Sequence, residues 1–99
     1  MKRLIVHHEA ELELWQAVDY YETKSSGLGL DFEQEVSQAF VNILKSPKRW
    51  PINTNGTSCC SLLRFPYSIN YIEMKDVIWI VAVAHMSRKP YYWRDRLKK

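Results

Sequence analysis

The run Val77–Ala84 (VIWIVAVA) constrains the fold more than any other segment, because every residue in it is apolar. A strand without polar positions must be covered on both faces, or nearly so, which places it at the centre of a sheet. The run before it, Tyr67–Glu73, alternates in character, so that every second residue shares a face. Lys75 and Asp76 lie between the two runs and predict a tight turn.

Two amphipathic helices are predicted before these strands. The first spans roughly Glu9–Thr23, with apolar residues at helical spacing on one face. Ser25–Gly29 then breaks the helix, and Asp31 with Gln34 three residues later predicts a capping box at the start of the second helix. Pro47 ends that helix. The short turn between the two helices predicts an αα-hairpin.

The remaining segments complete an α+β pattern. Arg3–His8 reads as a short strand, Pro51–Thr57 as a loop, and Ser58–Phe65 as a further strand. Pro90 is expected to open a short C-terminal helix, Tyr91–Leu97. Strands and helices segregate along the chain. We therefore predict one domain over residues 1–99, in which an N-terminal strand and an αα-hairpin pack on a four-stranded, mainly antiparallel sheet that ends in a short helix.

Cysteine and histidine usage argues against a cross-linked or metal-bound domain. Cys59 and Cys60 are neighbours, and adjacent residues bridge only with strained geometry, so we expect no disulfide framework. His7 and His8 follow each other on a predicted strand and would point to opposite faces, and zinc-ligand spacings are lacking. We predict no metal and no cofactor. The absence of a long apolar run and of a signal-peptide pattern makes a reducing cytoplasm the expected compartment.

Charge is unevenly distributed. Most of the eleven acidic residues lie in Glu9–Glu35, whereas most of the fourteen basic residues lie in Pro47–Lys99. The net charge of +3 is low for a protein that must neutralise many phosphates of a nucleic acid. The acidic first helix is most simply a solvated face, and the Lys98-Lys99 end most simply a solvated tail.

Several short motifs occur in a fixed order. Those in the C-terminal half are Arg64-Phe65-Pro66-Tyr67 with Ile69 and Tyr71, then Ile80–His85 (IVAVAH), then Arg88-Lys89-Pro90, Tyr92-Trp93 and Arg96. Those in the N-terminal half are Tyr20-Tyr21, Gly27-Leu28-Gly29, Phe32 and the helix that ends at Pro47. Together they resemble the RelE/ParE superfamily, the toxins of type II toxin–antitoxin pairs. The resemblance covers nearly the whole chain.

The resemblance implies a small cytoplasmic toxin that a cognate antitoxin holds inactive. RelE-like members cleave messenger RNA in the ribosomal A site, whereas ParE-like members poison DNA gyrase and are not enzymes. The FPY and H-x-x-R-x-P-x-YW arrangement is closer to the ParE-like group. The chain departs from the family at Ser58–Ser61, where one or two arginines are usual. That departure weakens the nuclease reading and leaves room for a non-toxic member that acts only as a binding module.

The two target classes predict different sites. For a gyrase poison we expect a docking surface of Arg88, Tyr92, Trp93 and Arg96, because aromatic and arginine side chains dominate protein interfaces. The alternative for Trp93 is that it packs on the sheet and anchors the last helix.

A nuclease would instead use His85 as acid or base, Arg64 and Arg88 on the phosphate, and Tyr91 for stacking or proton donation. The structural alternatives are that His85 caps the sheet edge and that Arg88 pairs with a helix carboxylate.

Overall fold

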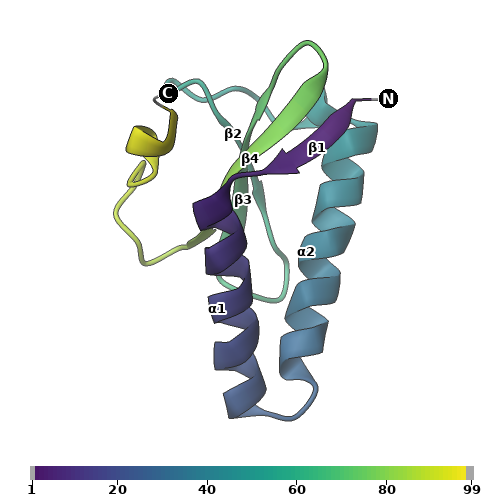
Figure 1. Cartoon of the computed structure of the whole chain (residues 1–99), viewed down its shortest axis with the longest axis vertical. Coiled ribbons are helices and arrows are strands. Elements are labelled where there is room, and N and C mark those ends of the chain that lie inside the picture. Colours follow the sequence, from purple (N-terminus) through teal and green to yellow (C-terminus); the bar gives the residue numbers. More distant parts are fainter. Residues whose placement is uncertain (1, 98–99) are drawn as a thin grey trace.

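The computed structural model describes residues 2–97, so the Lys98-Lys99 end lies outside the described residues. Its elements follow the predicted order. They are β1 (Arg3–Val6), α1 (His8–Lys24), α2 (Leu28–Lys45), the 3₁₀ turn η1 (Pro47–Arg49), β2 (Ser58–Ser61), β3 (Tyr67–Glu73), β4 (Val77–His85) and the 3₁₀ turn η2 (Arg94–Leu97). The α1–α2 hairpin extends beside the sheet, and η2 lies near the first turns of α1 (Figure 1).

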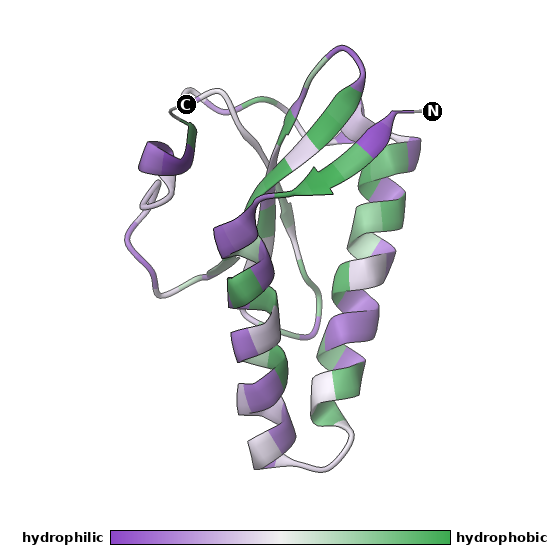
Figure 2. Ribbon diagram, viewed as in Figure 1, coloured by the Kyte–Doolittle hydropathy of each residue, from purple (hydrophilic) through white to green (hydrophobic). Residues whose placement is uncertain are grey.

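The sheet has the order β1-β4-β3-β2. β1 pairs with β4 in parallel, whereas β3 is antiparallel to both β4 and β2. The predicted mainly antiparallel, four-stranded sheet is therefore confirmed. β4 lies between two neighbours and is buried along most of its length, as its apolar sequence required. Figure 2 shows β1 and β4 as apolar along most of their length.

A bulge in β4 changes which of its residues face the helices. Asn70 lies opposite Ala82 and Tyr71 lies opposite Ile80, so Val81 has no partner on β3. The alternation of side chains shifts by one residue at that point. Ile78, Ile80 and Val83 consequently join the core beneath the helices. Val81, Ala82 and Ala84 form a second apolar cluster with Trp93.

The main core lies between the helical hairpin and the sheet. Its largest fully buried side chains include Tyr71, Phe32 and Ile43. The Tyr71 hydroxyl donates a hydrogen bond to the Pro47 carbonyl at 2.6 Å, which satisfies its polar end and ties β3 to the end of α2. No helix within residues 2–97 combines the length and the apolar character that a membrane crossing requires.

The helix boundaries agree with the sequence at most positions but not at the start of α2. Asp31 was predicted to cap this helix, but it lies within the first turn. The helix begins after Gly27, whose φ of 86° is in the left-handed region that glycine tolerates. The Glu22 carboxylate accepts hydrogen bonds from the Gly27 and Gly29 N–H groups instead. The cap therefore comes from the preceding helix, and the capping-box prediction was wrong.

Three elements are shorter than predicted. β1 ends at Val6 because the His7 side chain accepts a hydrogen bond from the Glu9 N–H and caps α1. β2 ends at Ser61 rather than continuing to Phe65. The C-terminal helix does not start after Pro90, because Tyr91 has a φ of 61° and cannot join a right-handed helix.

Gly29 provides a test of the hairpin packing. A Cβ atom at this position would lie 2.6 Å from the Val18 carbonyl oxygen and 3.1 Å from the Glu22 Cβ. Gly29→Ala should therefore destabilise the domain by about 1–3 kcal/mol, the usual effect of overpacking, although alanine is the better helix former. Thermal and urea unfolding measure the change, with Ser37→Ala on the exposed face of α2 as the control. An unchanged or raised stability would contradict the close approach of the two helices.

Candidate functional site

The residues after β4, Met86–Leu97, form the C-terminal segment, which folds back over the face of the sheet that the helices leave open. Its anchor is Trp93, which is only 8% exposed and packs against Val81, Ala82 and Ala84. The two alanines leave room for the indole ring. Tyr91 and Tyr92 contact the same ring edge to face, with centroids 5.8 Å and 5.4 Å away. Trp93 therefore packs on the sheet and anchors the segment, as the alternative prediction for this residue stated.

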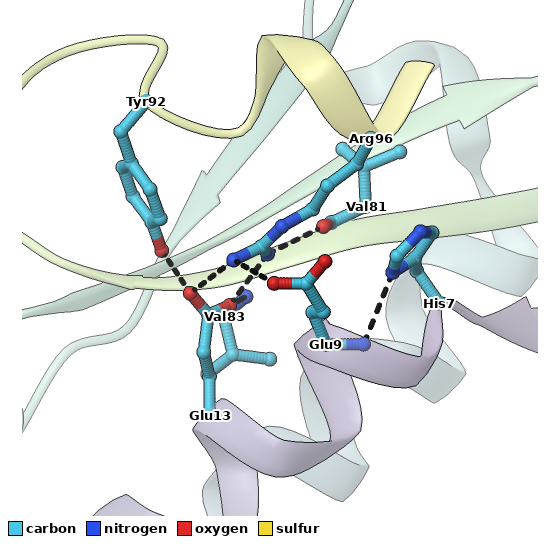
Figure 3. Close-up of polar contacts among 7 residues, drawn as sticks. All are labelled: His7, Glu9, Glu13, Val81, Val83, Tyr92 and Arg96. Carbon is cyan, nitrogen blue, oxygen red and sulfur yellow. Dashed lines mark hydrogen bonds and ion pairs between the residues drawn. The ribbon is translucent and has the colours of Figure 1, made fainter. Parts of the chain in front are cut away.

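The Glu13 carboxylate of α1 also holds the C-terminal segment, through Tyr92 and Arg96 (Figure 3). Glu13 Oε1 accepts hydrogen bonds from the Val83 N–H at 3.0 Å and from Arg96 Nη1 at 2.9 Å. Glu13 Oε2 accepts from Arg96 Nη2 at 2.9 Å and from the Tyr92 hydroxyl. Arg96 Nη1 also donates to the Val81 carbonyl at 3.0 Å. One carboxylate therefore joins α1, β4 and both ends of the Tyr92–Arg96 stretch.

The backbone of β4 explains why these polar groups meet. β1 stops opposite Ile80, so the Val83 N–H has no strand on that side and takes Glu13 as its acceptor. The bulge leaves Val81 unpaired with β3, and its carbonyl receives Arg96. Buried backbone groups are costly when unsatisfied. Glu13 and Arg96 thus complete the hydrogen bonding of an otherwise open strand edge.

The environment of this cluster shifts two pKa values. The hydrogen bond to Glu13 raises the pKa of the Arg96 guanidinium, which stays charged. Burial, followed by the hydrogen bond to Glu13, raises the pKa of the Tyr92 hydroxyl well above 10.0. The side chains of Glu13 and Arg96 are 13% and 10% exposed, so this is a largely enclosed ion pair with two parallel hydrogen bonds.

The structure places the four residues of the expected docking surface in two groups. Arg96 and Trp93 point inward, because the guanidinium is held by Glu13 and the indole is buried on the sheet. The expectation that Arg96 is offered outward was wrong. Arg88 is exposed, and its guanidinium carbon lies 3.9 Å from the centre of the half-buried Tyr92 ring. The outward-facing part is therefore Arg88 on Tyr92. The sequence predicted either a target contact or a helix carboxylate as the partner of Arg88, and it did not predict this stacking.

The expected nuclease residues come together only in part. His85, Arg88 and Tyr91 all line a hollow of about 290 Å³ beside the C-terminal segment. The His85 Nδ1 accepts a hydrogen bond from the Ser87 N–H at 2.9 Å, and its ring packs edge to face on Tyr67. Arg64 does not line this hollow, because its guanidinium lies 3.5 Å from Asp31 and above the Phe65 ring.

Other candidate groups have no organised site. Within residues 2–97 no set of three or more His, Cys, Asp or Glu side chains is arranged to hold a metal. Cys59 is half-buried and Cys60 is buried, and burial raises the pKa of the Cys60 thiol. Both lie on β2 as free thiols.

Glu13 is the residue of this region that the sequence analysis missed, because it was grouped with the solvated acidic face of α1. A signal was present. Glu13 lies three residues after Ala10 and four before Ala17, which are both buried. That spacing places it at the border of the buried stripe rather than opposite it.

Tyr92→Phe tests the hydrogen bond to Glu13 through pH. The pKa of the Tyr92 hydroxyl is higher in the folded protein than in the unfolded chain. The stabilisation of the fold by Tyr92 is therefore complete below about pH 10 and is lost as the pH rises further. At pH 7 the wild type should be about 1–2 kcal/mol more stable than the variant. That difference should shrink between about pH 10 and 11.5 in urea unfolding. A difference that stays constant or grows over this range would contradict the hydrogen bond.

No protein-family model matches this chain, and no curated protein matches it. Among solved structures, it is similar to a chain of the chromosomal ParDE toxin–antitoxin system from P. aeruginosa, with a TM-score of 0.75 and 18% sequence identity. The match covers 88% of this chain and 98% of that chain. In this chain the fold consists of the N-terminal strand, the two helices, the four-stranded mixed sheet and the short C-terminal turn. The chain therefore has the fold of that ParDE chain, the RelE/ParE-like fold that its motifs predicted.

Proposed function

We propose that this chain is the toxin of a type II toxin–antitoxin pair, that a cognate antitoxin neutralises it, and that it inhibits growth by contact with DNA gyrase. The observation that carries the proposal is Arg88, an exposed guanidinium held on the Tyr92 ring by a fixed segment of a ParDE-like fold. Arginine stacked on an aromatic ring is typical of the residues that dominate protein–protein interfaces. Both proposed partners, the antitoxin and gyrase, would be met in the cytoplasm.

The ion pairs of Arg96 and Arg64 favour contact over catalysis. Arg96 is neutralised by Glu13, and Arg64 lies beside Asp31. β2, which reads Ser58–Ser61, supplies no cation. A metal-free nuclease must surround the transition-state phosphate with positive charge. Of the arginines assigned to such a site, Arg88 alone lines the hollow beside His85. Within residues 2–97, the one other lysine or arginine that lines it is Lys89.

The proposal divides the expected docking residues by role. Arg88 and the edge of Tyr92 would contact the target. Trp93 and Arg96 would hold the segment in position from inside, through the sheet and through Glu13. Segments fixed in the bound conformation lose less entropy on association than mobile ones, so this anchoring would strengthen binding.

A ribosome-dependent endoribonuclease is the second candidate, because His85, Arg88 and Tyr91 do line one hollow. In that case His85 would transfer a proton, Arg88 would bind phosphate and Tyr91 would stack on a base. The left-handed backbone of Tyr91 holds its ring near Asn55, whose carbonyl accepts from the tyrosine hydroxyl at 3.5 Å.

Two assays on the purified protein separate these candidates. We expect inhibition of gyrase supercoiling and no cleavage of messenger RNA on programmed ribosomes. Cleavage in the A site with unaffected supercoiling would reverse the order. Silence in both assays, together with normal growth on induction, would refute both toxin proposals and favour a binding module.

Arg88→Ala and His85→Ala form a matched pair within the same hollow. If Arg88 is a contact residue, its loss should weaken gyrase inhibition by roughly tenfold or more, which corresponds to about 1.4 kcal/mol. His85→Ala should then change inhibition by less than about threefold. The concentration that halves supercoiling measures both effects, and unfolding curves control for stability. A larger loss with His85→Ala than with Arg88→Ala would contradict the contact proposal.

A further inference from the structure

We propose that Glu13 is a positioning residue for the surface formed by Arg88 and Tyr92, although it lies on α1 and its side chain is largely enclosed. The inference rests on the proposed function in naming that surface as the active one. It follows from three contacts of one carboxylate, which bind the strand edge at Val83, the ring-bearing Tyr92 and the guanidinium of Arg96.

The first step concerns which arginine faces outward. The C-terminal segment offers Arg88, Arg94 and Arg96 within nine residues. Glu13 binds Arg96 through both terminal nitrogens, each at 2.9 Å, and Glu9 approaches the same group at 3.8 Å. A guanidinium needs a partner when it is enclosed. Glu13 therefore determines that Arg96 lies inside and that Arg88 and Arg94 remain exposed.

The second step links Glu13 to Arg88 through Tyr92. The Tyr92 hydroxyl donates to Glu13, and this bond fixes the direction of the ring. The guanidinium of Arg88 lies above that ring, and Arg96 lies 5.2 Å from its centre. If the ring were free to turn, Arg88 would lose its support. The carboxylate on α1 thus sets the position of a cation that it does not touch.

The third step concerns what else fastens the segment. The Met86 N–H donates to the Pro66 carbonyl at its start, and the Tyr91 hydroxyl makes a long hydrogen bond of 3.5 Å. The buried Trp93 Nε1 has no hydrogen-bond partner within residues 2–97. Apolar contact of Trp93 holds the middle of the segment. Between Tyr92 and Arg96, the polar contacts that fasten the segment include those with Glu13, the Arg96–Val81 bond and the longer approach of Glu9 to Arg96.

Glu13→Gln tests the proposal on the intact chain. The amide keeps the size of the side chain but removes its charge, and its nitrogen opposes the donors of Arg96 or Tyr92. The control is Glu11→Gln, an exposed carboxylate on the same helix. Hydrogen exchange followed by mass spectrometry should show at least tenfold faster exchange of residues 87–97 in Glu13→Gln, with unchanged exchange in α2 and β3. Glu11→Gln should match the wild type.

Activity must change in a way that simple loss of stability would not produce. Glu13→Gln should weaken gyrase inhibition at least tenfold, with Glu11→Gln unchanged. If Glu13 acts through Arg88, both substitutions remove the same contact. The double variant Glu13→Gln/Arg88→Ala should then inhibit gyrase as well as the more impaired of the two single variants does. Multiplied losses in the double variant would overturn the proposal, as would wild-type exchange in Glu13→Gln.

A milder variant decides the outcome if Glu13→Gln does not fold. Tyr92→Phe retains the Glu13–Arg96 ion pair and removes one bond, so exchange at residues 87–97 should rise while inhibition falls less than in Arg88→Ala. Inhibition and exchange at wild-type values would overturn the link through Tyr92. If the wild type itself leaves gyrase unaffected, the proposed function fails, and the exchange arm alone then decides whether Glu13 positions the segment.

Discussion

The coverage of β4 on both faces organises this molecule. The helical hairpin covers one face, and the C-terminal segment must cover the other, because Val81, Ala82 and Ala84 would otherwise be exposed. Trp93 supplies the apolar part of that cover. The ion pair of Glu13 and Arg96 supplies the polar part, since it satisfies backbone groups that the bulge and the short β1 leave open.

The proposed activity depends on this same cover. A segment that covers one face of the sheet is not a solvated tail, and its outer surface has a fixed orientation. Arg88 and Tyr92 form that surface, while the enclosed Arg96 holds it in place. Under the proposed function, burying one arginine to orient another would use the segment both for stability and for recognition. An enclosed ion pair contributes less net stability than its contacts suggest, so its value here is mainly positional.

The sequence predicted the architecture more completely than the site. The apolar run of β4, the alternation in β3 and the two amphipathic helices were sufficient to predict the α+β fold and the central strand. The bulge was not predictable, because an apolar strand has no polar residues to mark a change of face. The left-handed Tyr91, which shortens the last helix, also lacks a sequence signal, since tyrosine rarely adopts that conformation.

The sequence did not predict how the residues of the C-terminal segment are oriented. Charge and composition identify Arg88 and Arg96 equally, and only the position of a carboxylate on α1 distinguishes the inner from the outer arginine. Glu13 is separated from Arg96 by most of the chain, so no local pattern connects them. Its spacing from Ala10 and Ala17 indicates partial burial, but it does not identify the partner.

The central claim is that the outer surface of the C-terminal segment contacts gyrase. The most direct measurement is hydrogen exchange of this chain with and without DNA gyrase, followed at the level of peptides. The account predicts slower exchange across residues 86–97 when gyrase is present, with the outer face of α2 unchanged. Slower exchange confined to another region, or no change at saturating gyrase, would contradict it.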